Sequence, residues 1–323
     1  MKQRYPLLAA ALFAFTLGAC SRGLPSAPRQ YLSGTSESLA TSPAELHSDR
    51  SHDRGEVFSA AGDIRTAVSN FRDALGTLNA NVPGSANGGR REINWDAVPA
   101  QFTNTNDFPA DFFNQPVVGR ARGAEFLTRG TGFRTSDNNF ADVAPDFDGP
   151  FEFFSPIRTF APVGSDRMAV DFFVPGSKDA ATSTGFGVVF SDVDRRGSAS
   201  IQLFDARGRS LGRYEAPVAP GALSFIGVRF ESALVASVEI RSGQAAVVTD
   251  GIDLGDRVLA PGRGHGTKDD DDGDDDGDRG EGHHRSPDLV IMDDFIYGEP
   301  IAITVESAPS LSVNASGAQR QAH

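Results

Sequence analysis

The region from residue 184 to residue 242 constrains the fold most, because short runs of alternating polar and apolar residues follow one another there. In residues 236–240, for example, Ala, Val and Ile alternate with Ser and Glu. A period of two is typical of a strand that buries one face. Turn-forming residues at 205–208 and 217–221 separate the runs. Strands at this spacing predict an all-β, jelly-roll-like β-sandwich.

Further strands are predicted at residues 125–127, 151–154, 168–174, 289–297 and 301–305. The chain has 24 Phe but one Trp and four Tyr, which indicates a Phe-rich core. Sugar-binding surfaces commonly present exposed Trp or Tyr, and the sandwich offers only Trp95, Tyr214 and Tyr297. Because Trp95 lies within an apolar pattern, we interpret it as a core residue.

One amphipathic helix is predicted before the sandwich, over residues 56–80. Ser59 is the expected N-cap and Gly76 the expected C-cap. The helix would either pack on the sandwich over an edge or open end, or bind a partner as a short coiled coil. We favour packing, because three heptads barely sustain a free coiled coil. Its apolar face would consist of residues spaced by three and four, namely Val57, Ala61, Ile64, Val68, Phe71, Leu75 and Leu78.

The amino terminus has the pattern of an export signal. Lys2 and Arg4 precede an apolar stretch at residues 7–17, which is too short to span a bilayer comfortably. The stretch ends in Leu-Gly-Ala-Cys, and Cys20 is the only cysteine of the chain. This ending resembles a bacterial lipobox, so we expect a signal peptide at residues 1–19 and lipidation of Cys20. An ordinary secretory signal cleaved before Cys20 is the alternative.

By resemblance to Gram-negative lipoproteins, Ser21 rather than Asp after the cysteine favours the outer membrane. The expected partner is therefore the membrane of the bacterial cell envelope, through the lipid anchor. Composition then divides the rest of the chain. We expect a flexible tether at 20–55, the helix at 56–80, the β-sandwich at 88–306 with an acidic insert at 262–286, and a disordered tail at 307–323.

The acidic insert contains nine acidic and three basic residues between Lys268 and Arg285. Three aspartates have the spacing that begins an EF-hand loop, but His283 stands where the bidentate Glu should be. Mutual repulsion without apolar residues predicts a disordered acidic loop instead. Such a loop would attract calcium only weakly.

Several function classes are disfavoured by composition. The formal net charge of −13 argues against nucleic acid as a partner. All six histidines lie in the tether, the insert or at the last residue, so a Ser-His-Asp triad or a His-based zinc site is not expected in the sandwich. A glycine-rich phosphate loop between a strand and a helix is also lacking, which argues against nucleotides. Carboxylate-pair chemistry remains open.

A set of segments resembles a group of uncharacterised bacterial exported proteins over about residues 60–300. The resemblance implies a β-sandwich similar in outline to jelly-roll carbohydrate-binding modules, and it transfers no catalytic residue. The lipobox and the acidic insert depart from that group. Besides the helix, the segments are GRREINWD, FPADFFN, RGAEFLTRGTGFRTS, TGFGVVFSDVD, SIQLFDARGRSLGRY, LSFIGVRF and VIMDDFIYGEP.

Two pairs of aspartates are candidate metal ligands. Asp293 and Asp294 are neighbours in a strand that is apolar on both faces, so alternation directs at least one carboxylate towards the core. A buried carboxylate must be paired, protonated or bound to metal. Asp192 and Asp194 follow another strand with a period of two. Jelly-roll sugar-binding modules are similar in using a last-strand carboxylate for structural calcium, so we expect calcium at some of these four residues.

The alternative is that these aspartates form turns and pair with Arg195 and Arg196. Taken together, the sequence predicts a lipid-anchored extracytoplasmic β-sandwich that acts as a binding or surface module. Glycan is the leading ligand class, on fold-level analogy. A carboxylate-based glycan-active enzyme and a structural protein of the cell envelope, with envelope proteins as partners, are the alternatives.

Overall fold

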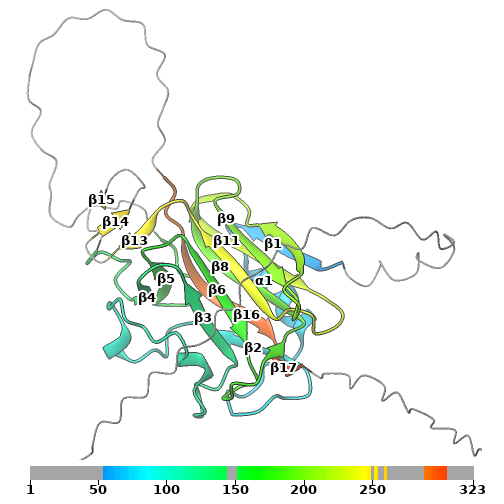
Figure 1. Ribbon diagram of the computed structural model, residues 1–323. Coiled ribbons are helices and arrows are strands. Elements are labelled where there is room, and N and C mark those ends of the chain that lie inside the picture. Colours follow the sequence, from blue (N-terminus) through cyan, green and yellow to red (C-terminus); the bar gives the residue numbers. More distant parts are fainter. Residues whose placement is uncertain (1–53, 144–150, 249–250, 254–257, 260–286, 304–323) are drawn as a thin grey trace, which may run out of the picture. The chain divides into compact units, whose positions relative to one another are not determined.

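The computed structural model describes residues 54–143, 151–248, 251–253, 258–259 and 287–303, and Figure 1 shows their arrangement. These residues form two β-sheets that share one apolar core, which confirms the all-β sandwich. The signal peptide with Cys20, most of the tether at 20–55, the acidic insert at 262–286 and the tail at 307–323 lie outside the described residues.

The larger sheet has the strand order β1-β11-β8-β16-β5-β13-β14-β15, with β2 paired to β16 and β4 paired to β5. Most neighbours are antiparallel. The strands are β1 (Glu56–Ala61), β2 (Arg90–Ile93), β4 (Gly132–Ser136), β5 (Thr159–Val163), β8 (Gly185–Val193), β11 (Ala219–Arg229), β13 (Ala246–Val248), β14 (Gly251–Asp253), β15 (Val258–Leu259) and β16 (Ile291–Gly298).

The second sheet has five antiparallel strands in the order β10-β9-β12-β6-β3. Val238 and Ile240 on β12 are buried in the core, whereas Glu239 between them is exposed. The predicted period of two is therefore correct for this strand. The strands are β3 (Ala124–Thr128), β6 (Arg167–Phe172), β9 (Ala199–Phe204), β10 (Ser210–Glu215) and β12 (Ser237–Ser242); β7 (Ala181–Thr182) and β17 (Ile301–Ala302) form a separate pair.

The predicted helix over residues 56–80 is wrong at its amino-terminal end. Residues 56–61 form the edge strand β1, which pairs with β11 along its whole length, and the helix α1 covers only Arg65–Leu75. Val57 is consequently 49% exposed. Ser59 lies in the strand and caps nothing, while Gly76 ends the helix as expected, with its N–H bonded to the carbonyl of Arg72.

The helix packs on the face of the larger sheet that points away from the sandwich core. Val68, Phe71 and Leu75 are buried against Phe225 of β11 and Ile296 of β16. The expected packing on the sandwich is thus confirmed, but the helix covers a sheet face rather than an edge or end (Figure 1).

Two glycines let α1 approach the sheet closely. A Cβ atom at Gly187 would lie 2.7 Å from the ring of Phe71, and one at Gly227 would lie 2.9 Å from the ring of Phe225. Such distances are shorter than any real carbon–carbon contact, so larger residues would push the helix outward. Gly187 in TGFGVVF and Gly227 in LSFIGVRF therefore leave the space that the ring of Phe71 occupies.

Trp95 lies at the centre of the core between the sheets and is 1% exposed, which confirms its interpretation as a core residue. Its ring stacks on Phe160 at 3.8 Å and meets Phe113 and Phe295 edge to face. Its backbone φ is +64°, a region that bulky residues rarely adopt. The surrounding aromatic contacts and the bond from its indole N–H to the carbonyl of Asp293 hold this conformation.

A buried ion pair joins the two strands that carry the motifs GRREINWD and VIMDDFIYGEP. Arg91 of β2 and Glu299, which follows β16, are each 1% exposed and form a bidentate pair with both distances 2.7 Å. Glu299 also accepts from the N–H of Ala86 and from Asn79, while Arg91 donates to the carbonyl of Ala121. The pair is therefore fully hydrogen-bonded.

We predict that Glu299→Gln strongly destabilises the sandwich, because it leaves the Arg91 cation buried without a counter-charge. The expected loss is about 3–5 kcal/mol in the free energy of unfolding, measured by urea denaturation. Asp63→Asn is the control, because Asp63 pairs with Arg65 at an exposed position and should change little. Equal losses in both variants would contradict the prediction.

Candidate functional site

Asp293 and Asp294 lie at an irregularity in β16. The register of β16 against β8 shifts between Met292 and Phe295. Before the shift, Val290 and Met292 face the core between the sheets; after it, Phe295 and Tyr297 do. Simple alternation would have placed these two pairs on opposite faces. The bulge therefore reverses the faces of the strand at the two aspartates, which the sequence pattern did not reveal.

Both aspartate side chains are buried and point to the same hydroxyl group. Asp293 is 0% exposed and Asp294 is 2% exposed. Ser155 lies 3.0 Å from an oxygen of Asp293 and 2.7 Å from an oxygen of Asp294, and the backbone N–H of Phe154 donates to Asp293 at 2.8 Å. Residues 151–154, predicted as a strand, form no ladder, so the amide of Phe154 is free to bind the carboxylate.

One proton is held by this pair. Burial, and then the neighbouring charge of Asp294, raise the pKa of Asp293 to about 8. Burial also raises the pKa of Asp294, opposed by hydrogen bonds from Ser155 and Asp293 and by the charge of Arg72. The raised pKa keeps a proton on Asp293 at neutral pH, and Asp293 is hydrogen-bonded to Asp294.

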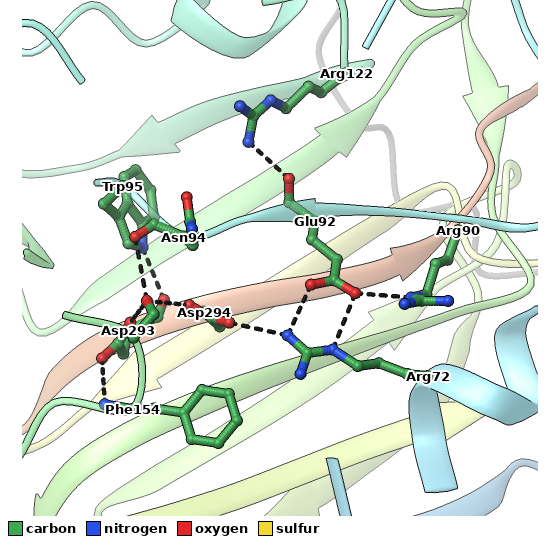
Figure 2. Close-up of polar contacts among 10 residues, drawn as sticks. Arg72, Arg90, Glu92, Asn94, Trp95, Arg122, Phe154, Asp293 and Asp294 are labelled. Carbon is green, nitrogen blue, oxygen red and sulfur yellow. Dashed lines mark hydrogen bonds and ion pairs between the residues drawn. The ribbon is translucent and has the colours of Figure 1, made fainter. Parts of the chain in front are cut away.

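Arg72 of α1 connects the aspartates to β2 (Figure 2). It lies 3.2 Å from Asp294 and donates twice to Glu92, at 2.9 and 2.7 Å. Arg90 donates to the same Glu92 carboxylate at 2.7 Å. We call Arg72, Arg90, Glu92, Asp293 and Asp294 the β16 cluster. With Asp293 protonated, the two arginines of the cluster balance the carboxylates of Glu92 and Asp294.

The β16 cluster does not fit a divalent cation. The carboxylate oxygens of Asp293 and Asp294 already accept from Ser155, Phe154 and the guanidinium of Arg72. A cation placed there would meet the positive charge of Arg72.

The structure places Asp192 and Asp194 in a second group, with Asp288. Asp192 accepts from the N–H of Gly221 at 2.6 Å. One oxygen of Asp288 accepts from the hydroxyl of Ser198 and from the N–H of Asp194. These bonds hold the loop that follows β8 and the amino-terminal end of β11.

Burial, and the charges of Asp194 and Asp288, raise the pKa of Asp192. Among the residues that the structure describes, no three or more His, Cys, Asp or Glu side chains are arranged to hold a metal ion. Calcium binding by Asp192, Asp194, Asp293 and Asp294 therefore stays a prediction from the sequence, and the geometry of neither group favours it.

The second sheet offers the accessible surface that the β16 cluster lacks. A groove of about 430 Å³ crosses its outer face. Its middle is a row of residues in register across all five strands. The row consists of Leu127, Ala169, Glu239, Gln202 and Arg213; the other lining residues are Thr128, Arg129, Arg167, Met168, Ser200, Ile240 and Arg241.

The two sites differ in what they can do chemically. A glycosidase needs two carboxyl groups on either side of an accessible bond. The aspartates of the β16 cluster are buried beyond the reach of a polysaccharide, and Glu239 is the one carboxylate among the residues lining the groove. The groove suits binding, because its polar side chains project from a rigid sheet.

No aromatic residue is among those that line the groove. Trp95 and Tyr297 are buried in the core, and Tyr214 is half-buried and does not line the groove. Among the described residues, no helix is long and apolar enough to cross a membrane.

Comparisons with known proteins add little. Neither protein-family models nor curated proteins match the chain. Among solved structures, the K2 cleaved adhesin domain of Lys-gingipain aligns with TM-score 0.31 and 8% identity over 65% of this chain and 99% of that domain. The enzymatically active domain of tailspike protein 4 of bacteriophage CBA120 aligns with TM-score 0.16 and 16% identity, over 45% of this chain and 21% of that one. Neither likeness is close enough to transfer a function.

We predict that Asp293→Asn removes part of the pH dependence of stability. Between about pH 4 and pH 8 the folded protein holds a proton on Asp293 that the unfolded chain has released, so its free energy of unfolding falls as pH rises. Asparagine imitates the protonated form and has no such loss. Urea denaturation at pH 5, 6.5 and 8 should show the wild type losing up to about 1.4 kcal/mol per pH unit relative to the variant. Parallel profiles would show that Asp293 holds no extra proton.

A second prediction concerns calcium, for which sequence and geometry disagree. Because Arg72 occupies the β16 cluster and the Asp192 group lacks a ready set of ligands, we expect identical melting curves in millimolar calcium and in EDTA. The protein should lack residues 262–286, so that loose binding by the acidic insert does not interfere. A ligand of the native state must raise the melting temperature by mass action. A higher melting temperature in calcium, abolished by Asp194→Asn, would restore the calcium hypothesis.

Proposed function

We propose that this chain is a glycan-binding module of the bacterial cell envelope, anchored by lipid at Cys20, and that the groove on the second sheet is its binding surface. The observation that carries the proposal is the groove itself. It is open to solvent and crosses five paired strands, and Gln202, Glu239 and Arg213 project into it. Amide, carboxylate and guanidinium groups are the side chains that bind sugar hydroxyls.

The span of the groove favours an extended ligand. Four strand spacings of about 4.8 Å separate Leu127 on β3 from Arg213 on β10, which gives a row of about 19 Å. That length suits a polymer lying across the strands better than a single small molecule. Leu127 is 50% exposed and offers an apolar contact at one end.

The anchor has its own test. Labelling with a radioactive fatty acid should mark the wild-type protein and leave Cys20→Ala unlabelled, because only the thiol of Cys20 can take the thioether-linked lipid. Equal label in both proteins, or none in either, would exclude the lipid anchor.

The binding function is tested with the double variant Gln202→Ala/Glu239→Ala on a glycan array. Both side chains face solvent from paired strands, so the variant should keep its melting temperature. Each lost hydrogen bond is worth about 1 kcal/mol, so binding should weaken by about tenfold or more. Gln101→Ala, at an exposed position outside the groove, is the matched control. If the folded wild type binds no glycan, or if all three proteins bind alike, the groove is not a glycan site.

The same preparations separate binding from catalysis. A binding module releases no reducing sugar from a glycan that it retains. If the wild type releases reducing sugar and Glu239→Gln does not, the groove is instead an active site.

A further inference from the structure

The groove on the second sheet concentrates positive charge on an acidic protein. Four arginines line it, against the single carboxylate of Glu239. The whole chain, by contrast, has a formal net charge of −13. A local charge opposite to the overall charge is not explained by solubility, which any surface charge would serve. The arginines are Arg129, Arg167, Arg213 and Arg241.

Two of these arginines have no counter-charge among the residues that the structure describes. Neither Arg129 nor Arg213 forms an ion pair with any residue that the structure describes, and both are exposed. The other two share one partner, because Asp166 lies 3.8 Å from Arg167 and 3.2 Å from Arg241. Counting Asp166 and Glu239 against the four arginines, the groove keeps two positive charges in excess.

The arrangement on the sheet places like charges side by side. Arg167 on β6 and Arg241 on β12 are direct cross-strand partners, and like charges in that position are destabilising. Arg129 directly follows Thr128, whose partner is Met168 beside Arg167. Three arginines therefore gather at one side of the groove, and Arg213 lies at the far end of the row. Three neighbouring arginines suit a ligand with several anionic groups, because a single small anion would need only one of them.

We propose that the groove binds an acidic polysaccharide, one that carries carboxylate groups along its length. Arg129, Arg167 and Arg241 receive its carboxylates at one side, and Arg213 receives another at the far end. The planar guanidinium fork matches a carboxylate with two parallel hydrogen bonds. This proposal rests on the proposed glycan-binding function and specifies its ligand.

Glu239 favours a polysaccharide over polyanions that have no sugar hydroxyls. It lies in the middle of the row, between Ala169 and Gln202. A carboxylate there accepts hydrogen bonds from sugar hydroxyls, which polyphosphate and polyglutamate lack. An acidic polysaccharide supplies hydroxyls for Glu239 together with carboxylates for the arginines.

The test compares three probes with the full mature protein by isothermal titration calorimetry. Polygalacturonate carries the carboxylates, its methyl ester has the same backbone without charge, and polyglutamate has carboxylates without sugar. We expect polygalacturonate to bind about tenfold or more tightly than either other probe. Its affinity should fall as salt rises from 50 to 300 mM, because the arginines are exposed and salt screens them.

The variant Arg129→Gln/Arg213→Gln removes the two unpaired arginines and breaks no ion pair between described residues, so it should fold normally and bind polygalacturonate about tenfold more weakly. Arg196→Gln is the control, because Arg196 is 91% exposed and lies outside the groove. Equal affinity for polygalacturonate and its ester would overturn the acidic ligand while leaving glycan binding intact. Equal affinity for polyglutamate, or no binding of polygalacturonate, would also overturn it; retention of a neutral glycan on the array would then show that the proposed function survives.

Discussion

The burial of β16 is the constraint on which the rest of the structure depends. Every residue of this strand is buried, because the sandwich core covers one face and α1 with residues 151–155 covers the other. A charged group in such a strand costs several kcal/mol unless it is paired. Asp294 and Glu299 are therefore bound by Arg72 and Arg91, which come from the beginning of the domain. The charges thus fix where α1 and β2 lie on the strand.

This constraint explains why three of the recognisable segments occur together. The helix contributes Arg72, GRREINWD contributes Arg90, Arg91 and Glu92, and VIMDDFIYGEP contributes both aspartates and Glu299. A change in one segment leaves an unpaired buried charge in another. The ion pairs of Arg72 and Arg91 join different segments. They form because the ladder between β2 and β16 brings the segments side by side.

Features set by neighbouring residues, such as strand alternation and the end of the helix, could be predicted from the sequence. Features set by contacts between distant segments could not. The alternation at residues 236–240 identified β12, and Gly76 was recognised as the end of the helix. Val57 and Ala61 also match helical spacing, yet pairing with β11 makes residues 56–61 a strand. Reasoning about Asp293 and Asp294 correctly required a buried carboxylate, but Arg72 is 222 residues away in the chain and the bulge has no sequence signal. The groove could not be predicted either, because its residues become neighbours only through the strand order.

The two sheets differ in how their outer faces are covered. α1 packs on the outer face of the larger sheet, and the polar groups of the β16 cluster are buried on that side, where they bind one another. The second sheet keeps an open outer face, where Arg129 and Arg213 form no ion pair with any described residue and Arg167 and Arg241 share Asp166. The buried β16 cluster is shielded from salt, and burial raises the pKa of its Asp293, whereas salt screens the charges of the open groove. A change in pH is therefore expected to act on the packing around Asp293, and a change in salt on the ligand binding that we propose for the groove.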